Sequence, residues 1–201
     1  MSSTAENRGP VDLISQRARP QIFDDQGGEF FFEMREALGF DVVFAEEFNI
    51  LRPYLGRISR LWPVKLQDLI LEKSDLADKI STRDVAELDA LMKRYARQML
   101  SGRFYEEFYK TTEELAQFFV KRQVPNAWLV SSFMGMFHDA QLEIFFDREA
   151  RQGRIVVSAL RCLLKIMTLT VQIMNRCAFM HQEKESVSSA PPKNKVARQQ
   201  A

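Results

Sequence analysis

The chain has 201 residues, of which 46% are hydrophobic, and it holds only eight glycines and seven prolines. This composition excludes an intrinsically disordered protein and argues against a turn-rich β fold. The 28 basic and 27 acidic side chains leave a net charge of +1, which gives no indication of nucleic acid or an anionic membrane as a partner. Sixteen phenylalanines and nine methionines predict a large core or a pocket for an apolar ligand, and a packed core is the simpler interpretation.

Both ends of the chain differ in composition from its middle. Residues 1–27 mix Ser, Arg, Pro, Asp and Gly without a helical period, which predicts a flexible arm. The first ten residues lack the apolar run of a signal peptide, so we expect a cytoplasmic protein. Residues 183–201 carry paired serines, paired prolines and scattered lysines, which predicts a solvated tail. The predicted folded domain is therefore 28–182.

Within that domain apolar residues recur at helical spacing almost throughout, so we predict an all-α fold. The first segments are residues 30–38, 41–54 and 55–71. Pro63 lies inside the third segment and should either start a helix or kink it.

The next helix has clear signals at both of its ends. Ser81 followed three positions later by Asp84 predicts a capping box. Ser101-Gly102 predicts the end of the helix. Between them, one face is marked by apolar residues every three or four positions: Val85, Leu88, Met92, Tyr95 and Met99.

Three further segments complete the domain. Apolar spacing predicts a helix from Phe104 to Phe119 that ends before Val124-Pro125. Asn126 is the expected N-cap of a helix whose apolar stripe is Leu129, Phe133, Phe137, Ala140 and Ile144. A break at Gln152-Gly153 precedes a long last helix, at about 154–182.

The last helix raises two questions of its own. Arg161, Lys165 and other polar residues interrupt its apolar run, so a buried helix is expected rather than a membrane span, which needs about 20 apolar residues. Its two cysteines, Cys162 and Cys177, are fifteen residues apart. They would lie ~22 Å apart along a helix and therefore should not form a disulfide with each other.

One stretch carries a resemblance to a known family. Residues 118–128 read FFVKRQVPNAW, and this stretch is similar to the F-to-G helix junction of bacterial sensor globins. In that family a haem-ligating histidine stands nine residues before the tryptophan, with Val-Pro between them. The order of elements and the Gly-Arg-aromatic-acid turn at 101–108 also resemble the globin-coupled sensor (protoglobin-like) family. The resemblance covers about residues 38–180 and implies a three-on-three helical sandwich with an extra N-terminal helix.

The sequence departs from the family where the haem would bind. Phe119 stands in place of the proximal histidine, and Arg122-Gln123 replace the usual Ile-Gly. Trp62 aligns with the distal tyrosine. A phenyl ring has no lone pair for iron, so the resemblance implies a haem-free variant with no metal and no cofactor. It is similar in this to the haem-free globins of stressosome proteins and to fatty-acid-binding sensor domains of sporulation regulation.

Other ligands for haem are few in this chain. His138 lies mid-helix on what would be the wrong helix for globin geometry, and we keep it as a ligand only if haem is bound after all. Cys162 and Cys177 are expected to be buried apolar residues. Adjacent acid pairs such as Glu46-Glu47 should diverge by ~100° on a helix and form a solvated face. No phosphate loop, CxxC motif or nucleophile elbow is present, so we expect no enzyme.

The resemblance also predicts a pocket and an interface. The pocket walls would be Trp62, Leu91, Tyr95, Leu115, Phe119, Trp128 and Phe133, either packed against one another or holding a fatty-acid-like ligand. The last helix is apolar on nearly every side and should need a second copy to cover it. We expect a homodimer through Leu160, Leu163, Leu164, Met167, Val171 and Met174.

Three functions stay open on the sequence alone. The first is a stand-alone, haem-free sensor globin that binds an apolar ligand, a partner protein or both. The second is a haem-binding gas sensor with an atypical ligand. The third is a structural interaction protein with a closed core. No output module is apparent, so we expect any signal to pass through an unidentified partner protein.

Overall fold

A computed structural model describes residues 25–72, 76, 78–146 and 153–189. All regular secondary structure in these ranges is helical, which confirms the all-α prediction. The helices are α2 (Asp25–Ala37), α3 (Val42–Ile58), α4 (Trp62–Leu71), α6 (Thr82–Ser101), α7 (Glu106–Lys121), α8 (Asn126–Phe146) and α9 (Gly153–Ser189).

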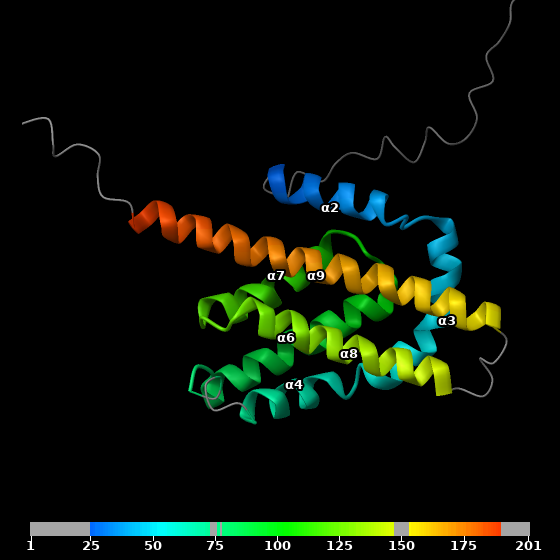
Figure 1. Cartoon of the computed structure of the whole chain (residues 1–201), viewed down its shortest axis with the longest axis horizontal. Helices are drawn as coiled ribbons and strands as arrows, with labels where there is room; N and C mark the ends of the chain where they lie inside the picture. The colour runs from blue at the N-terminus through cyan, green and yellow to red at the C-terminus, as the bar shows by residue number, and fades with distance from the viewer. Residues whose placement is uncertain (1–24, 73–75, 77, 147–152, 190–201) are drawn as a thin grey trace, which may run out of the picture.

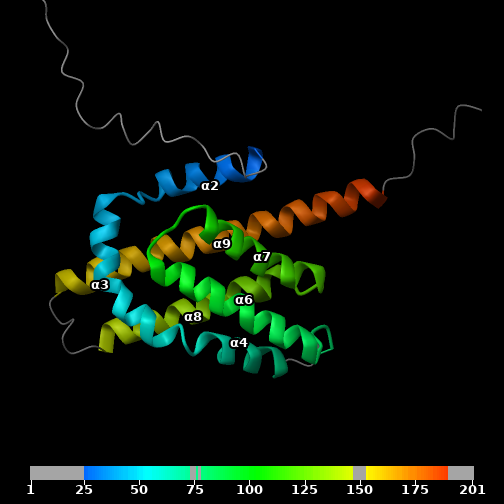
Figure 2. The same cartoon turned by 180° about the vertical axis from the view of Figure 1, so that it is seen from behind.

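The helices form two layers of three. Helices α3, α8 and α9 contact one another in one layer, and α6 contacts both α4 and α7 in the other. Contacts of α7 with α9 and of α4 with α8 join the layers, and α2 lies beside α9 as an additional helix (Figures 1 and 2). This arrangement is the globin-like three-on-three sandwich that the sequence predicted.

The boundary between α3 and α4 resolves the ambiguity around Pro63. Asp41 caps α3 by accepting a 3.0 Å hydrogen bond at Oδ1 from the backbone N–H of Phe44. The helix ends at Ile58, and Pro63 lies in the first turn of α4. A proline in a first turn removes no internal hydrogen bond, so Pro63 starts a helix and does not kink one.

Both predicted signals of α6 are confirmed. Ser81 and Asp84 form a reciprocal capping box, with the Ser81 N–H donating to Asp84 Oδ2 at 2.8 Å. Gly102 caps the C-terminus in the left-handed region at a φ of 71°. The apolar stripe of α6 faces inward: Leu88, Met92, Tyr95 and Met99 are buried.

The outermost helices extend beyond their predicted limits. Helix α2 begins at Asp25, so Gly27 and Gly28 are buried in a helix rather than ending an arm. Helix α9 continues to Ser189, seven residues past the predicted limit at residue 182. The rest of the predicted arm and tail, residues 1–24 and 190–201, lies outside the described residues.

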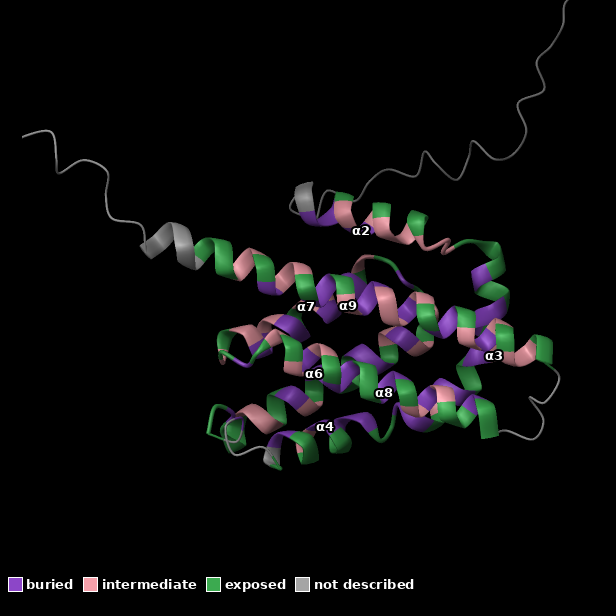
Figure 3. Cartoon of the chain, viewed as in Figure 1, coloured by how far each residue is buried: buried purple, intermediate pink, exposed green. Residues whose placement is uncertain are grey.

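Helix α9 is long and apolar enough to cross a membrane by length and composition. A third of its most apolar window is buried inside the fold. One such helix is weak evidence, since a core helix passes the same test. Here α9 contacts α3, α7 and α8, and its residues Cys162, Ile166, Leu169 and Ile173 lie in the core. Figure 3 shows buried and exposed residues alternating along its length. These contacts show that one face of α9 belongs to the core of the domain.

Candidate functional site

The predicted pocket residues lie in the interior. Trp62, Leu91, Tyr95, Leu115, Phe119 and Phe133 are all buried, and Trp128 is partly buried against the same core. They come from four helices, α4, α6, α7 and α8, that surround the middle of the sandwich. The fold therefore brings together residues that are separated by up to 71 positions in the chain.

Much of this interior is filled by aromatic rings in contact. The Tyr95 ring lies 6.4 Å from Trp62 and 5.5 Å from Phe133, measured between ring centroids. Two rings not among the predicted pocket residues complete the group: Phe137 at 5.7 Å from Trp62, and Phe108 at 5.7 Å from Tyr95. Phe137 belongs to the predicted apolar stripe of α8, and its position on that stripe could have identified it as a residue of the interior.

The Tyr95 side chain also makes a polar contact. Its hydroxyl lies 2.9 Å from Thr170 Oγ1 of α9, and both residues are fully buried. Burial raises the pKa of the Tyr95 phenol well above its usual range, so the hydroxyl keeps its proton. By contrast, Trp62 Nε1 is buried with no hydrogen-bond acceptor among the described residues.

Phe119 occupies the last turn of α7 with no solvent exposure. Its ring lies 5.1 Å from Phe118 and 6.1 Å from Trp128. Neither of these neighbours carries an atom that ligates iron. His138, which the sequence analysis kept as a ligand only if haem is bound, is exposed on α8. Its Nδ1 lies 3.3 Å from Gln141 Oε1. This set of donors does not fit a haem iron.

The turn after Phe119 is held by Arg122. Its guanidinium lies 3.6 Å from the centre of the Phe118 ring and donates to the Phe118 carbonyl at 2.9 Å. It also pairs with Asp84 and, at 3.0 Å, with Glu87 at the start of α6. The Arg122 and Ser81 hydrogen bonds hold the pKa of Asp84 far below its usual range. The residue after Arg122, Gln123, has a positive φ of 54°.

Asn126 differs from its predicted role as an N-cap. It is the first residue of α8, and its side-chain Nδ2 donates at 2.8 Å to Asn175 Oδ1 of α9. The turn is instead closed by backbone bonds, including one from Val124 N–H to the Phe119 carbonyl at 3.0 Å.

An ion pair with one buried member is the polar feature that sequence reasoning missed. Glu47 is 4% exposed, whereas its neighbour Glu46 is exposed. The expectation that this acid pair forms a solvated face is therefore wrong for Glu47. Arg161 of α9 pairs with Glu47 Oε1, and Glu47 Oε2 has no partner among the described residues. The helical spacing was the available signal, because Glu47 falls on the same face of α3 as the buried residues Phe44 and Leu51.

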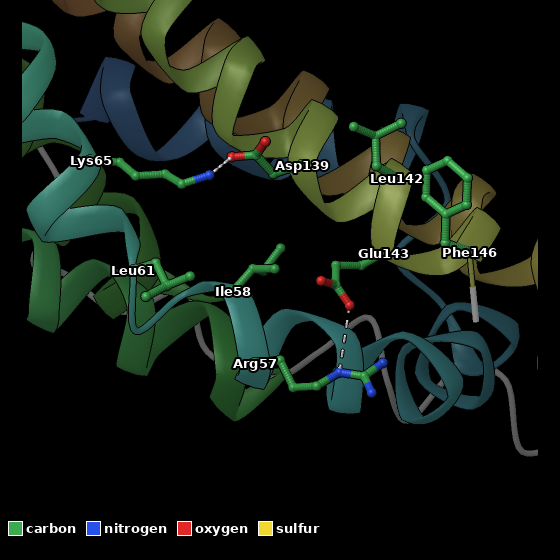
Figure 4. A pocket seen from close by; sticks show the side chains of 8 residues that line it. All are labelled: Arg57, Ile58, Leu61, Lys65, Asp139, Leu142, Glu143 and Phe146. Atoms are coloured by element: carbon green, nitrogen blue, oxygen red, sulfur yellow. Dashed lines mark hydrogen bonds and ion pairs between the residues drawn. The ribbon is translucent and has the colours of Figure 1, made fainter. Parts of the chain in front are cut away.

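Three grooves of about 260 to 500 Å³ lie elsewhere, and none of the seven predicted pocket residues lines these three. The largest runs between the α3–α4 corner and α8 (Figure 4). Two ion pairs cross this groove. Lys65 Nζ lies 2.5 Å from Asp139 Oδ2, and Arg57 Nε lies 3.9 Å from Glu143 Oε2. Between these ion pairs the walls are apolar, formed by Ile58, Leu61, Leu142 and Phe146.

The predicted interface residues on α9 divide into two sets. Leu163 and Met174 are 1% and 0% exposed and belong to the core of the protomer, so they are not free to contact another copy. Leu164 is 47% exposed, and Leu160, Met167 and Val171 are partly exposed. Val157 and Phe179 were missed, although both are more than half exposed on the same helix.

The cysteines agree with the sequence analysis, since neither forms a disulfide. Burial raises the pKa of Cys162 to about 12 and, with a smaller contribution from the Glu113 charge, that of Cys177 to about 11. Both thiols are therefore unreactive near neutral pH. No group of three or more His, Cys, Asp or Glu side chains in the described ranges is arranged to hold a metal ion.

Comparison with known proteins agrees with the fold. No curated protein matches the sequence. A family model described as Protoglobin matches residues 34–184, which spans α3 to α8 completely together with the end of α2 and most of α9. The chain is thus a globin-type sensor domain and belongs to the protoglobin family.

Proposed function

We propose that this protoglobin is a haem-free regulatory module that works as a homodimer and signals by contact with a partner protein. The single observation that carries the proposal is the position of Phe119. Its ring is fully buried at the end of α7, where the resemblance expects the iron-ligating histidine. A phenyl ring can fill that space but cannot hold iron.

The neighbouring rings support a closed interior. Trp62 and Phe137 are in contact at the distal side, and Tyr95 is fixed by its hydrogen bond to Thr170. Rings packed at these distances leave little room for a porphyrin without displacement of several side chains. We infer that the protein uses its surface, rather than a cofactor, to communicate.

The test is the visible absorption spectrum of the full chain, expressed with haem precursor supplied. We expect no Soret band from this protein. A haem-binding globin prepared in the same way is the positive control and should show the band. A stoichiometric Soret band would overturn the proposal. In that case His138→Ala would show whether the band depends on the only histidine on α8.

The dimer is proposed on the exposed apolar face of α9 and α8. Val157, Leu164 and Phe179 are 61%, 47% and 58% exposed on α9, and Met134 and Phe145 are 42% and 61% exposed on α8. A helix pair with this much exposed apolar surface gains free energy when a second copy covers it. A two-fold arrangement of two α8–α9 pairs would form a four-helix interface.

A second candidate function is favoured by Trp62. Its indole N–H is buried without an acceptor, and such a group is costly unless a water or ligand oxygen reaches it. A core that opens for an apolar molecule with one polar end would satisfy it, as in a fatty-acid-like ligand. Mass spectrometry of an organic extract of the purified protein tests this. An equimolar acyl species would favour ligand sensing, and its absence would favour the closed core.

A further inference from the structure

A groove of about 260 Å³ between α7 and α9 has the charge of an anion-binding site. One wall is the α7 face with Tyr109, Glu113, Gln117, Val120 and Lys121. The other is the α9 face with Arg176, Cys177, Met180, His181 and Lys184. The groove is separate from the aromatic interior, and none of the seven predicted pocket residues lines it.

Three cations and one carboxylate line this groove. Lys121, Arg176 and Lys184 contribute +3 and Glu113 contributes −1, which gives +2 with His181 counted as neutral. Glu113, Lys184 and Arg176 each lie close enough to influence the pKa of the Cys177 thiol. Lys121 and Lys184 have no ion-pair partner among the described residues. Unpaired like charges facing one groove repel each other unless an anion lies between them.

The groove is also shaped before any ligand arrives. The Arg176 guanidinium lies 4.8 Å from the centre of the Phe30 ring of α2, which holds it at the edge of the groove. Cys177 Sγ lies 3.9 Å from the Glu113 carbonyl, so the two helices meet closely at this level. Tyr109, Val120 and Met180 add an apolar surface beside the cations. A fixed guanidinium suits a phosphate because it donates two parallel hydrogen bonds.

We propose that the α7–α9 groove binds a small, soluble phosphate monoester, with the dianionic phosphate at Lys121, Arg176 and Lys184 and an apolar or aromatic group against Tyr109 and Met180. The net charge of +2 matches a dianion better than a monocarboxylate. The proposal goes beyond the proposed function and does not depend on it, because neither haem nor a core ligand is involved.

The experiment is isothermal titration calorimetry of the full chain at low salt with three probes: phenyl phosphate, inorganic phosphate and phenol. We expect saturable binding of phenyl phosphate that is tighter than that of either of the others. In Lys121→Gln/Lys184→Gln the affinity should fall roughly tenfold or more, because two charge-assisted contacts are lost. The matched control is Arg52→Gln/Arg60→Gln, which removes two exposed cations of α3 and the α3–α4 turn. The control should bind as the parent does.

Several results would overturn the proposal. The first is the absence of saturable phenyl phosphate binding. Another is equal affinity for inorganic phosphate, which would remove the role of the apolar surface. Equal losses in the two double variants would show only a general charge effect. Binding to phosphatidylcholine vesicles with one-fifth phosphatidic acid, without binding of phenyl phosphate, would assign the cations to a lipid surface instead. Thermal unfolding of each variant confirms that it is folded.

Discussion

The ring of Phe48 in α3 packs directly over Gly102, so that a β-carbon on Gly102 would lie 2.7 Å from Phe48 Cε1 and 2.9 Å from Cδ1. Gly102 also has a φ of 71°, which side chains with a β-carbon adopt at a cost. Two independent constraints thus require glycine at the turn that leads into α7. Phe48 in turn contacts Phe104 at 5.6 Å, so this turn sets where α7 begins against α3.

Gly102→Ala should destabilise the fold by roughly 2 to 3 kcal/mol, the sum of the left-handed backbone cost and the displacement of Phe48. Urea denaturation measures the change. Gly56→Ala is the control, since Gly56 lies inside α3 and a β-carbon there meets nothing within 4 Å. That variant should be more stable by about 0.5 to 1 kcal/mol. Equal effects at both positions would contradict this account of the turn.

Gln123→Gly should stabilise the protein by about 1 kcal/mol, because Gln123 holds a positive φ of 54° that glycine adopts freely. Gln172→Gly is the control, because Gln172 lies in the interior of α9. Glycine there should lower the free energy of unfolding by about 1 kcal/mol. Thermal unfolding would show the two shifts with opposite signs. A loss of stability at both positions would mean that the Gln123 side chain itself matters.

The pairing of Arg122 with Asp84 predicts an acid-dependent stability. The pKa of Asp84 is lower in the folded state than its usual value near 4, so its ionised form stabilises the fold at neutral pH. That contribution is lost as the pH falls below about 4 toward the folded pKa. Arg122→Gln should show a smaller decrease in urea midpoint between pH 6 and pH 3 than the parent. Lys93→Gln, which breaks an exposed pair with Asp89, should keep the parental decrease.

Removal of Arg161 should leave Glu47 with a buried and unpaired charge. Arg161→Met is expected to destabilise the fold by roughly 2 to 3 kcal/mol, because Glu47 is almost fully buried whereas Arg161 is half exposed. Adding Glu47→Gln to Arg161→Met should restore part of that loss, since the neutral amide is cheaper to bury. Chemical denaturation of the single and double variants gives the coupling between them. If the effects of the two substitutions on the free energy of unfolding simply add in the double variant, the pairing is refuted.

Leu164→Glu should convert the proposed dimer into a monomer at micromolar concentration. Leu164 is 47% exposed in the middle of the apolar face of α9, where a carboxylate would be desolvated by a second copy. Light scattering after size exclusion gives the mass. Val64→Glu is the control, because Val64 is 57% exposed on α4, away from that face. A parent chain that is already monomeric would exclude the dimer.

The sequence predicted the helices well because their signals are local. The capping box at Ser81, the glycine at 102 and the stripe from Leu129 to Ile144 each depend on residues within a few positions of one another. The boundaries at Asp25 and Ser189 were missed, since weakly apolar end turns are helical only because the neighbouring turns are already formed.

Tertiary contacts were harder to predict. The burial of Phe119 followed from its alignment with a ligand position, but the contact of Tyr95 with Thr170 joins residues 75 positions apart. No periodic pattern encodes such a pair. The pairing of Glu47 with Arg161 is equally non-local, although the burial of Glu47 itself follows from its place on the inward face of α3. The α7–α9 groove likewise needs two helix faces side by side, and each face alone reads as an ordinary mixed surface.

Three of the polar contacts that α9 makes with the rest of the fold lie at different levels along its axis. Arg161 holds Glu47 of α3, Lys165 Nζ donates to the Gly39 carbonyl at 2.8 Å, and Thr170 meets Tyr95 of α6. A slide of α9 along its axis by one turn, about 5.4 Å, would break all three at once. Motion of α9 is thereby restricted to tilting or rotation together with the helices it contacts. The end of α9, which projects past the bundle in Figure 1, would then move through an arc whose size grows with distance from Thr170.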